Sequence, residues 1–412
     1  MNILKGDKKL EFILFLILMN PIVDLLTGVY LKTLNLNPKF TPGIIVRNLI
    51  LLYLFYLVYV NKLKIKYFIL LVLTFLFTNL SQILSGLQLN AFSETQYFLK
   101  FVYNMAILLV GLEIIKEFRE YEYEKIFKYF TLSAFIYAVV VVVTFLLGVG
   151  YKTYSYSTAT KGFFYAGNDL TAAISVVYPI SLYLIIRRED IKLDLLVIYN
   201  LIIMLALVII GTRVAYLSIF VSFIAYFIYV VITRNKSMLR QFIYMALLTV
   251  ITFHLFSYMI QTHKNINLIE NTIERQEAIL NRTENDVTSY VLNQRNLKFR
   301  AAYEDYKETN LLRKLFGISR SGEVENIEMD FADVFLFYGL VGFIVMTFYI
   351  IKYGIQFLLR FTKYKGSLLY VALLVSLFIG FGSSFLAGHV LFSASAGLYA
   401  FLVLAVSNSI FE

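Results

Sequence analysis

Cysteine is absent from the 412-residue chain, and charged residues make up only 16% of it. The lack of cysteine excludes disulfides, thiol nucleophiles and cysteine-based metal sites, although it decides no compartment. A soluble domain carries roughly a quarter charged residues. The scarcity of charge, a mean hydropathy of +0.73 and apolar runs from end to end therefore indicate an all-α protein that crosses a membrane many times.

Several motifs of other function classes are also missing. The sequence contains no P-loop and no cytoplasmic DxD-type site for a nucleotide sugar, and its three histidines lack the spacing of metal ligands. We interpret each histidine as a solvated or hydrogen-bonded side chain. The net charge of +10 requires no nucleic acid, because cytoplasmic loops of membrane proteins are enriched in Lys and Arg. We therefore predict no metal, no cofactor and no nucleic-acid partner.

The apolar segments predict about twelve membrane spans. The run 195–232 contains a single charge, Arg213, and as one helix it would be about 57 Å long, nearly twice the hydrocarbon thickness. It must turn back, and Gly211-Thr212 is the only plausible turn, which puts Arg213 at a membrane surface. We read the first run as an uncleaved helix. The spans lie near 10–31, 43–60, 67–86, 97–115, 127–149, 164–186, 195–210, 214–233, 241–260, 331–351, 367–386 and 390–408.

Basic residues are concentrated at one end of the predicted bundle. They lie before the first span and in the loops near 62–66, 116–128, 187–192, 234–240 and 352–365. The positive-inside rule then places both termini in the cytoplasm and Arg213 on the outer side of the cytoplasmic membrane.

One long polar loop breaks the regular alternation of spans. It divides the chain into spans 1–9 (1–260), an extracytoplasmic loop (261–329) and spans 10–12 (330–412). The segment LIENTIERQEAIL is amphipathic, and Arg295, Phe299 and Tyr303 share one helical face. We predict that this loop folds into a helical cap.

Ionisable and polar side chains within the spans gather in the outer half of the bundle. A charge at the bilayer centre costs about 2.5–3.5 kcal/mol, so such residues usually pair or line a wet cavity. Their shared depth predicts one polar cavity that opens outward. The alternatives are that a rim arginine reaches lipid headgroups and that Asp24 simply pairs with Arg47. The residues are Asp24, Arg47, Asn168, Asp169, Arg213, His254, Asp330, Asp333 and His389.

Carboxylates cluster where the long loop meets the next span. Asp330 and Asp333 lie three residues apart at the start of a predicted helix, after Glu323, Glu325 and Glu328. Acids in a first turn also compensate the helix dipole. A carboxylate beside arginines would nevertheless suit acid-base chemistry on an anionic substrate, because arginine holds phosphate and the carboxylate accepts a proton from a hydroxyl.

The order of four segments resembles the O-antigen polymerase and ligase superfamily, which includes the Wzy-type polymerases. AGNDLTAAISVVYPISLYL is similar to a G-N-x-L-A stretch followed by proline, and GTRVAYLS to a G-[ST]-R-x-x-x-L turn. QRNLKFRAAYEDY runs into LLRKLFGIS, and EMDFADVFLFYGLVGF resembles the segment that closes the large loop. These segments cover residues 166–345. Where ligases of the superfamily commonly have a histidine, this chain has Glu328, Asp330 and Asp333, which favours a polymerase or a ligase of another surface polymer over a lipopolysaccharide ligase.

The resemblance implies a GT-C-like membrane glycosyltransferase that polymerises undecaprenyl-pyrophosphate-linked repeat units into a surface polysaccharide such as a capsule or O-antigen. It implies partners in a flippase and a chain-length regulator besides the lipid bilayer. Arg213 would bind pyrophosphate with Arg295 or Arg300, assisted by Arg47, and Asn168 would contact phosphate or sugar. Asp330 is the first choice for a base and Asp333 the second, with Glu328 also near the substrate. The alternatives are an O-antigen-ligase-like transfer to another acceptor and, less favoured, a lipid-linked oligosaccharide flippase or transporter.

Overall fold

Helices form all the regular secondary structure longer than a single bridge in the part of the chain that the structure describes. The computed structural model describes residues 7–154, 158–264, 266, 268–283, 286–319 and 327–412. Within these residues ten helices are long and apolar enough to cross a membrane, and two shorter apolar helices accompany them. The prediction of an all-α protein with about twelve membrane helices is confirmed.

The membrane helices follow the predicted spans closely. Their bounds are α1 (Asp7–Lys32), α2 (Pro42–Val60), α3 (Ile65–Leu84), α4 (Ala91–Ile115), α5 (Glu120–Leu147), α6 (Gly167–Ile186), α7 (Leu195–Ile210), α8 (Arg213–Thr233), α9 (Lys236–Lys264), α14 (Asp330–Leu359), α16 (Leu368–Ala387) and α17 (Ala394–Ile410). Two short helices, η1 (Pro38–Phe40) and α15 (Phe361–Tyr364), lie in connections.

The long apolar run turns back at the predicted place. Gly211 ends α7 with a φ of 69°, and its N–H donates to the carbonyl of Leu207. Thr212 then caps α8, because its hydroxyl accepts from the N–H of Ala215 at 3.2 Å. Arg213 is therefore the first residue of α8 and lies at a helix end rather than in the middle of a span.

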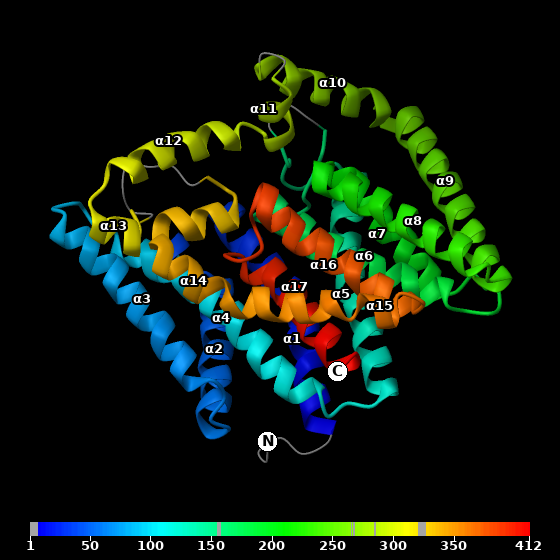
Figure 1. The fold of residues 1–412 in the computed structure, drawn as a ribbon. Helices are drawn as coiled ribbons and strands as arrows, with labels where there is room; N and C mark the ends of the chain where they lie inside the picture. Colours follow the sequence, from blue (N-terminus) through cyan, green and yellow to red (C-terminus); the bar gives the residue numbers. More distant parts are fainter. Residues whose placement is uncertain (1–6, 155–157, 265, 267, 284–285, 320–326) are drawn as a thin grey trace.

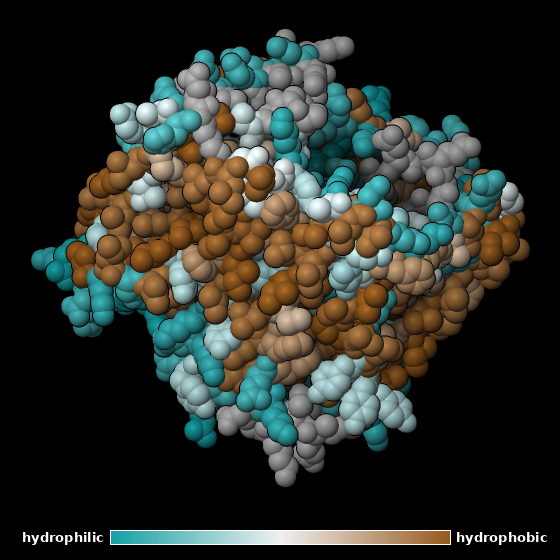
Figure 2. Space-filling model, turned by 180° about the vertical axis from the view of Figure 1, so that it is seen from behind, coloured by the Kyte–Doolittle hydropathy of each residue, from teal (hydrophilic) through white to brown (hydrophobic). Residues whose placement is uncertain are grey.

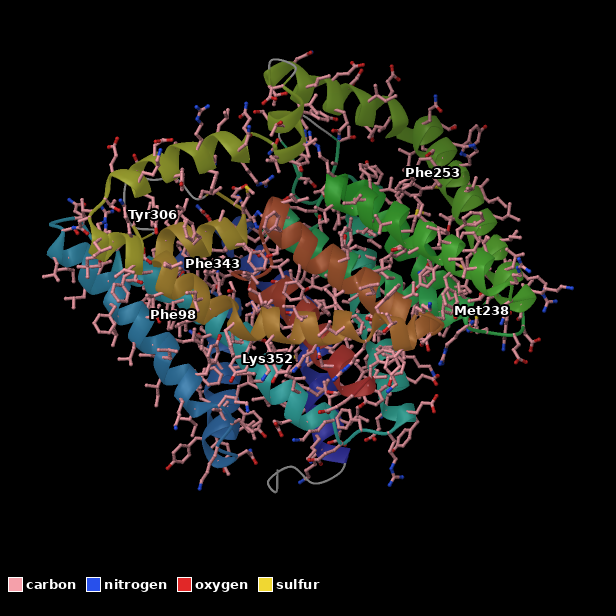
Figure 3. The ribbon with its side chains drawn as sticks, in the orientation of Figure 1. Phe98, Met238, Phe253, Tyr306, Phe343 and Lys352 are labelled. Atoms are coloured by element: carbon pink, nitrogen blue, oxygen red, sulfur yellow. The ribbon has the colours of Figure 1, made fainter. Side chains whose placement is uncertain are left out.

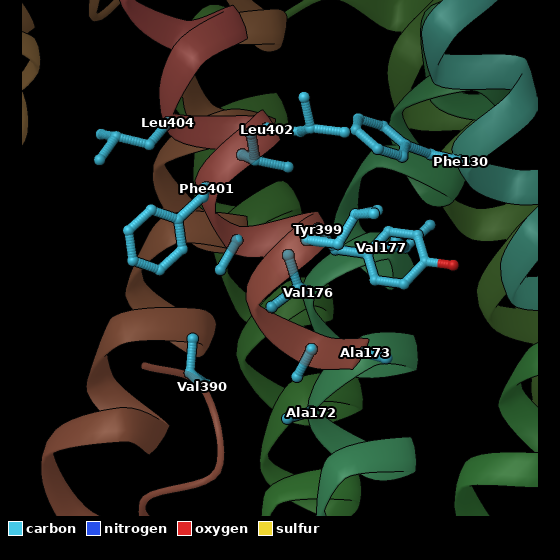
Figure 4. Packing of buried hydrophobic residues seen from close by; sticks show 14 of the residues in the cluster. Phe130, Ala172, Ala173, Val176, Val177, Val390, Tyr399, Phe401, Leu402 and Leu404 are labelled. Carbon is cyan, nitrogen blue, oxygen red and sulfur yellow. The ribbon is translucent and has the colours of Figure 1, made fainter. Parts of the chain in front are cut away.

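Helices α6 and α17 form the centre of the bundle. Every residue from Leu170 to Ile186 is buried, and α17 packs against both α4 and α6. Figure 4 shows Ala172, Ala173 and Val176 of α6 beside α17. Small residues allow this close approach of helices. The N-terminal ends of α6 and α17, where the polar residues of interest lie, are therefore held rigidly in the middle of the molecule.

The lateral surface of the bundle, which would face lipid, is apolar around its middle. Figure 2 shows a broad hydrophobic band between more hydrophilic regions at both ends. Large exposed side chains in this band come from many helices, such as Leu52, Leu76, Phe220 and Leu255. A multi-pass membrane protein requires such a band, because lipid replaces water around it.

The polar loop after α9 contains four helices, which we call the cap. They are α10 (Leu268–Arg282), α11 (Val287–Leu292), α12 (Arg295–Glu308) and α13 (Leu311–Phe316). Figure 1 shows the cap at the opposite end of the molecule from the two chain termini. Tyr306 of α12 lies between the cap and α14, where its ring is 5.2 Å from that of Phe335 (Figure 3).

A kink in α14 fastens the cap to the bundle. Gly339 has a φ of 69° and a ψ of −172°, which only glycine adopts readily. The break frees two carbonyls of α14 from their helical partners, so that Leu336 accepts from the N–H of Ile318 at 2.9 Å and Phe337 from that of Ser319 at 3.2 Å. The chain after α13 is thus hydrogen-bonded to the kink.

We expect Gly339→Ala to loosen this junction. An added Cβ would lie 2.5 Å from the backbone of Leu315 and Gly317, and the positive φ would strain any other residue. The backbone strain of about 1–3 kcal/mol and an overpacking cost of about 1–3 kcal/mol should lower the stability of the detergent-solubilised protein. Thermal unfolding measures this. Gly354→Ala in the same helix is the control, because open space surrounds Gly354; equal melting temperatures for the two variants would contradict the prediction.

Candidate functional site

A cavity of about 300 Å³ lies between α1, α2, α4 and α6, near the ends of these helices that face the cap. Polar and aromatic side chains mix in its wall, which is the pattern of small-molecule sites. The lining includes Asp24, Arg47, Gln96, Lys100, Tyr103, Tyr137, Phe164, Tyr165, Asp169 and Ser395. We call this cavity the α1–α2 pocket.

An ion pair forms one wall of the α1–α2 pocket. Arg47 Nη2 donates to Asp24 Oδ1 at 2.5 Å, to Asn20 Oδ1 at 2.8 Å and to Ser395 Oγ at 3.0 Å. The second oxygen of Asp24 accepts from the hydroxyl of Tyr137. The sequence left open whether Arg47 pairs with Asp24 or faces an anionic substrate. The structure shows the pair, and it also places both residues on the pocket wall.

We expect Arg47→Met to destabilise the protein by about 3 kcal/mol, because it leaves the carboxylate of Asp24 without its counter-charge. The pocket reduces this cost to the low end of the range for buried pairs, because each side chain keeps about 15% of its surface exposed. Asp24→Leu in the same chain should restore most of the loss. Thermal unfolding of the single and double variants tests this, and a double variant no more stable than Arg47→Met would contradict it.

A carboxylate–imidazole pair links α6 to the loop between α16 and α17. His389 Nδ1 and Asp169 Oδ1 are 2.9 Å apart, and Ser393 Oγ donates to Asp169 Oδ2 at 2.8 Å. The other ring nitrogen, His389 Nε2, lies 3.1 Å from Asn168 Nδ2. If Nδ1 carries the proton that Asp169 accepts, Nε2 is an acceptor. This is the tautomer that a general base needs.

The charge of Asp169 also affects the titration of His389. Burial alone would lower the pKa of the imidazole, but the hydrogen bond and the negative charge of Asp169 outweigh burial. Asp330 and Glu328 add to the effect, so the pKa of His389 lies above its ordinary value of 6.5. His389 belongs to the loop between two membrane helices, next to the end of α16.

Asp330 holds this loop in place. Its two oxygens accept from the backbone N–H groups of residues 389, 390 and 391, at 3.2, 2.8 and 2.8 Å, and from Ser384 Oγ at 2.7 Å. From the other side Asn104 Nδ2 donates to the carbonyls of Val390, Leu391 and Ser393. Both side chains are buried. These contacts give Asp330 a role in positioning His389.

Asp330 and Asn104 also explain where α17 begins. The predicted span began at residue 390, but α17 begins at Ala394. Residues 390–393 lie in the loop instead, because their backbone groups bond to Asp330 and Asn104 rather than to a helical turn.

Arg213 lies under the cap rather than in the α1–α2 pocket. Its Nη1 donates to the carbonyl oxygens of Tyr290 and Val291, and its Nε donates to Gln276 Oε1 at 3.3 Å. The guanidinium carbon lies 4.2 Å from the centre of the Tyr290 ring, a cation–π contact. Arg213 therefore fastens α10 and α11 of the cap to the start of α8.

Of the remaining predicted site residues, some are buried and paired and one is exposed to solvent. Arg295 is buried in the cap and pairs with Glu328 at 2.9 Å, whereas Arg300 on the same helix is exposed. Asp333 is buried and accepts from the N–H of Ile327 at 3.2 Å. Glu323 and Glu325 lie outside the described residues.

Three sets of residues meet around the loop 388–393: the Arg295–Glu328 pair, Asp330, and His389 with its partners on α6. The backbone carbonyl of Glu328 lies next to Gly388, where an added Cβ would be 2.7 Å from it. The Arg295–Glu328 pair therefore adjoins the loop that Asp330 holds. From the same loop His389 contacts Asp169 and Asn168. A polar band thus runs from Arg295 to Asp169. Among the described residues no group of three or more His, Cys, Asp or Glu side chains could hold a metal ion.

Sequence reasoning missed the partnership of His389 and the place of Lys100. The histidine is separated from Asp169 by 220 positions, and no spacing rule connects them. Lys100 reads as an ordinary surface lysine, yet it lines the α1–α2 pocket, close enough to act on the charge of Asp169. The sequence did contain a signal for this grouping, because Lys100, Asp169 and His389 all lie in the predicted outer half of the bundle.

A search of curated proteins gives no match to this chain. The family described as O-antigen ligase-like membrane proteins matches residues 6–278 and 260–410, which together cover nearly the whole sequence. The matched region includes every helix of the bundle and of the cap. The chain belongs to the O-antigen ligase-like membrane protein family, whose description supports a role in glycan transfer or polymerisation at a membrane.

Proposed function

We propose that this protein polymerises undecaprenyl-pyrophosphate-linked repeat units into a surface polysaccharide on the outer face of the cytoplasmic membrane. The observation that carries the proposal is the set of contacts of His389. Asp169 and Asn168 contact the two ring nitrogens of His389 and so fix its imidazole within the polar band. Arg213 of α8 and Arg295 of the cap lie at the same end of the bundle (Figure 1). The distribution of Lys and Arg supports placing that end outside.

The chemistry requires one bond to form and one to break. A hydroxyl of the new repeat unit attacks the anomeric carbon of the lipid-linked chain, the bond from that carbon to pyrophosphate breaks, and undecaprenyl pyrophosphate leaves. The hydroxyl proton passes to His389 Nε2 once the hydroxyl has taken the place of the Asn168 amide there. Arg213, with Arg295 or Arg300, would stabilise the charge that develops on the pyrophosphate.

We assign the base role to His389 rather than to Asp330, the first choice from the sequence. Both oxygens of Asp330 already accept hydrogen bonds, four in all. Abstracting a proton would require it to release the backbone that positions His389. Asp333 is buried beside Ile327 and remains the second carboxylate to test.

The test is a reconstituted reaction. The purified full-length protein in liposomes is given lipid-linked repeat units extracted from the native host, and the products are separated by size. A ladder of lengthening chains supports polymerisation. A preparation that leaves single units unchanged, but transfers pre-formed long chains to another acceptor, supports a ligase. The ligase is the second candidate because the family is described as O-antigen ligase-like.

We expect the rate of polymerisation to fall as the pH is lowered through the pKa of His389. Only the neutral imidazole accepts a proton, and the neutral form predominates above the pKa, which Asp169 raises above 6.5. The acid limb of the pH–rate profile should therefore have its midpoint above 6.5. The residual activity of His389→Ala should lack this limb, and an unchanged limb in that variant would assign it to another group.

A further inference from the structure

The α1–α2 pocket contains polar groups that the protein itself leaves unused. Gln96 Nε2 is buried and has no hydrogen-bond partner among the described residues. Tyr103 also lines the pocket, and the three hydrogen bonds of the Arg47 guanidinium to described residues all use Nη2. An unpaired buried donor costs about 1–3 kcal/mol, so Gln96 Nε2 is expected to meet a ligand or water in the pocket.

The position of Arg47 supports a ligand rather than simple packing. Arg47 and Gly43, one helical turn apart in α2, both line the pocket. Asp24, Asn20 and Ser395 fix the guanidinium through Nη2, which leaves the other nitrogens for a bound molecule. A side chain fixed in this way loses little entropy on binding.

The wall also contains four aromatic side chains, beside aliphatic ones such as Leu31 and Leu99. Tyr103, Tyr137, Phe164 and Tyr165 line the pocket together with the donors and acceptors just described. A pyranose has apolar C–H faces bounded by hydroxyl groups, so it matches a wall that contains both aromatic rings and hydrogen-bonding groups. The volume of about 300 Å³ is at the low end for ligand pockets, which fits one or two sugar rings.

Charge distinguishes a sugar from the other parts of a lipid-linked substrate. The charged residues among the described lining are two acids, Asp24 and Asp169, and two bases, Arg47 and Lys100, so their formal charges cancel. A pyrophosphate would require an excess of positive charge, and a prenyl chain would leave the buried polar groups unpaired. A neutral polyhydroxylated ligand fits both observations.

We infer that the α1–α2 pocket binds the terminal sugar of the acceptor repeat unit. The inference rests on the proposed function and adds a substrate site to it. Asp169 belongs both to the pocket wall and to the pair with His389, so a sugar in the pocket lies beside the residue that orients the base. The donor pyrophosphate would lie under the cap at Arg213.

The absence of cysteine allows a direct test. Gln96→Cys introduces a single thiol on the pocket wall, and Ile44→Cys provides a second one on the first turn of α2. Each full-length variant, in membrane vesicles, is labelled with a small hydrophilic methanethiosulfonate reagent. Gln88→Cys, an exposed position in the connection between α3 and α4, is the matched control.

Three probes are added in turn: the oligosaccharide repeat unit freed from its lipid by mild acid, inorganic pyrophosphate and undecaprenyl phosphate. We expect the oligosaccharide to slow labelling at positions 96 and 44 by about tenfold when it is present at about ten times its dissociation constant. Labelling at position 88 should not change, and the other two probes should protect neither site.

Protection by pyrophosphate or undecaprenyl phosphate alone would overturn the inference, because the pocket would then bind the anionic head or the lipid. No protection at either pocket position by millimolar oligosaccharide would also overturn it. The test involves no turnover. If the wild-type protein polymerises but the cysteine variants show no protection, the proposed function stands and the inference fails. If the variants are protected but the wild-type protein makes no polymer, the pocket binds sugar and the proposed function fails.

Discussion

Replacing His389 with alanine should reduce the rate of polymerisation by about 10²–10⁴-fold, the contribution of a positioned general base. The proton of the acceptor hydroxyl then has no acceptor at the position that Asp169 and Asn168 define. The measurement is the initial rate of chain growth in liposomes at a fixed amount of protein. Asp169→Asn should cause a smaller loss, because the imidazole stays but its tautomer is no longer fixed.

The matched control for this prediction is His254→Ala. His254 is an exposed histidine of α9, and its loss should leave the rate unchanged. Asp330 offers the opposite comparison. If Asp330 were the base and His389 only a structural residue, His389→Ala would stay active over a normal pH range, whereas Asp330→Asn would be inactive although its loop and its melting temperature were intact. That pair of results would contradict the account.

Arg213→Ala should lower the rate by about 10²–10³-fold, the typical loss when one donor to a developing negative charge is removed. Arg213 also fastens the cap through Tyr290 and Gln276, so activity alone would not distinguish the two roles. The decisive measurement is inhibition by undecaprenyl pyrophosphate, the leaving group. A phosphate-binding arginine predicts much weaker inhibition in the variant, whereas a purely structural arginine predicts unchanged inhibition of whatever activity remains.

Two further variants test whether Arg213 binds pyrophosphate. Tyr290→Ala removes the cation–π contact but not the guanidinium, so it should loosen the cap while keeping sensitivity to undecaprenyl pyrophosphate. Arg240→Ala is the control for charge, because Arg240 lies on α9 near its start, at the other end of the bundle from the cap. Equal inhibition constants for Arg213→Ala and Arg240→Ala would remove the pyrophosphate role.

The helices of the bundle could be predicted because they depend on local composition. Each span is a continuous apolar stretch, and length alone forced the turn at Gly211 and placed Arg213 at a helix end. Helix ends that project beyond the apolar stretch were less predictable. Helix α9 runs from Lys236 to Lys264, past the predicted 241–260, since polar residues continue a helix without marking its end.

The cap was predictable only in part. The shared face of Phe299 and Tyr303 is present in α12, where the two rings stack with centres 5.8 Å apart. The docking of the cap on Gly339 was not predictable, because it depends on a backbone break in α14 that no propensity reveals. The partners of Arg295 and Arg213 likewise depend on how distant segments meet.

The site was the least predictable part, because its residues meet through tertiary structure. Depth in the membrane correctly grouped Asp24, Arg47 and Asp169, since residues at one depth lie in one layer of the bundle. It could not show that Asp330 bonds to the backbone beside His389 or that Arg47 and Arg213 occupy different places. Those facts depend on which helices are neighbours.

The most direct test of the central claim is a deletion of the gene in its native host, followed by separation of the surface glycan by size, with lipid-linked and envelope-linked material kept apart. We predict that long chains disappear and single repeat units remain, and that the wild-type gene restores the long chains whereas the His389→Ala gene does not. An unchanged glycan would contradict the account. Long chains that accumulate on the lipid carrier and never reach the envelope would contradict polymerisation and identify a ligase.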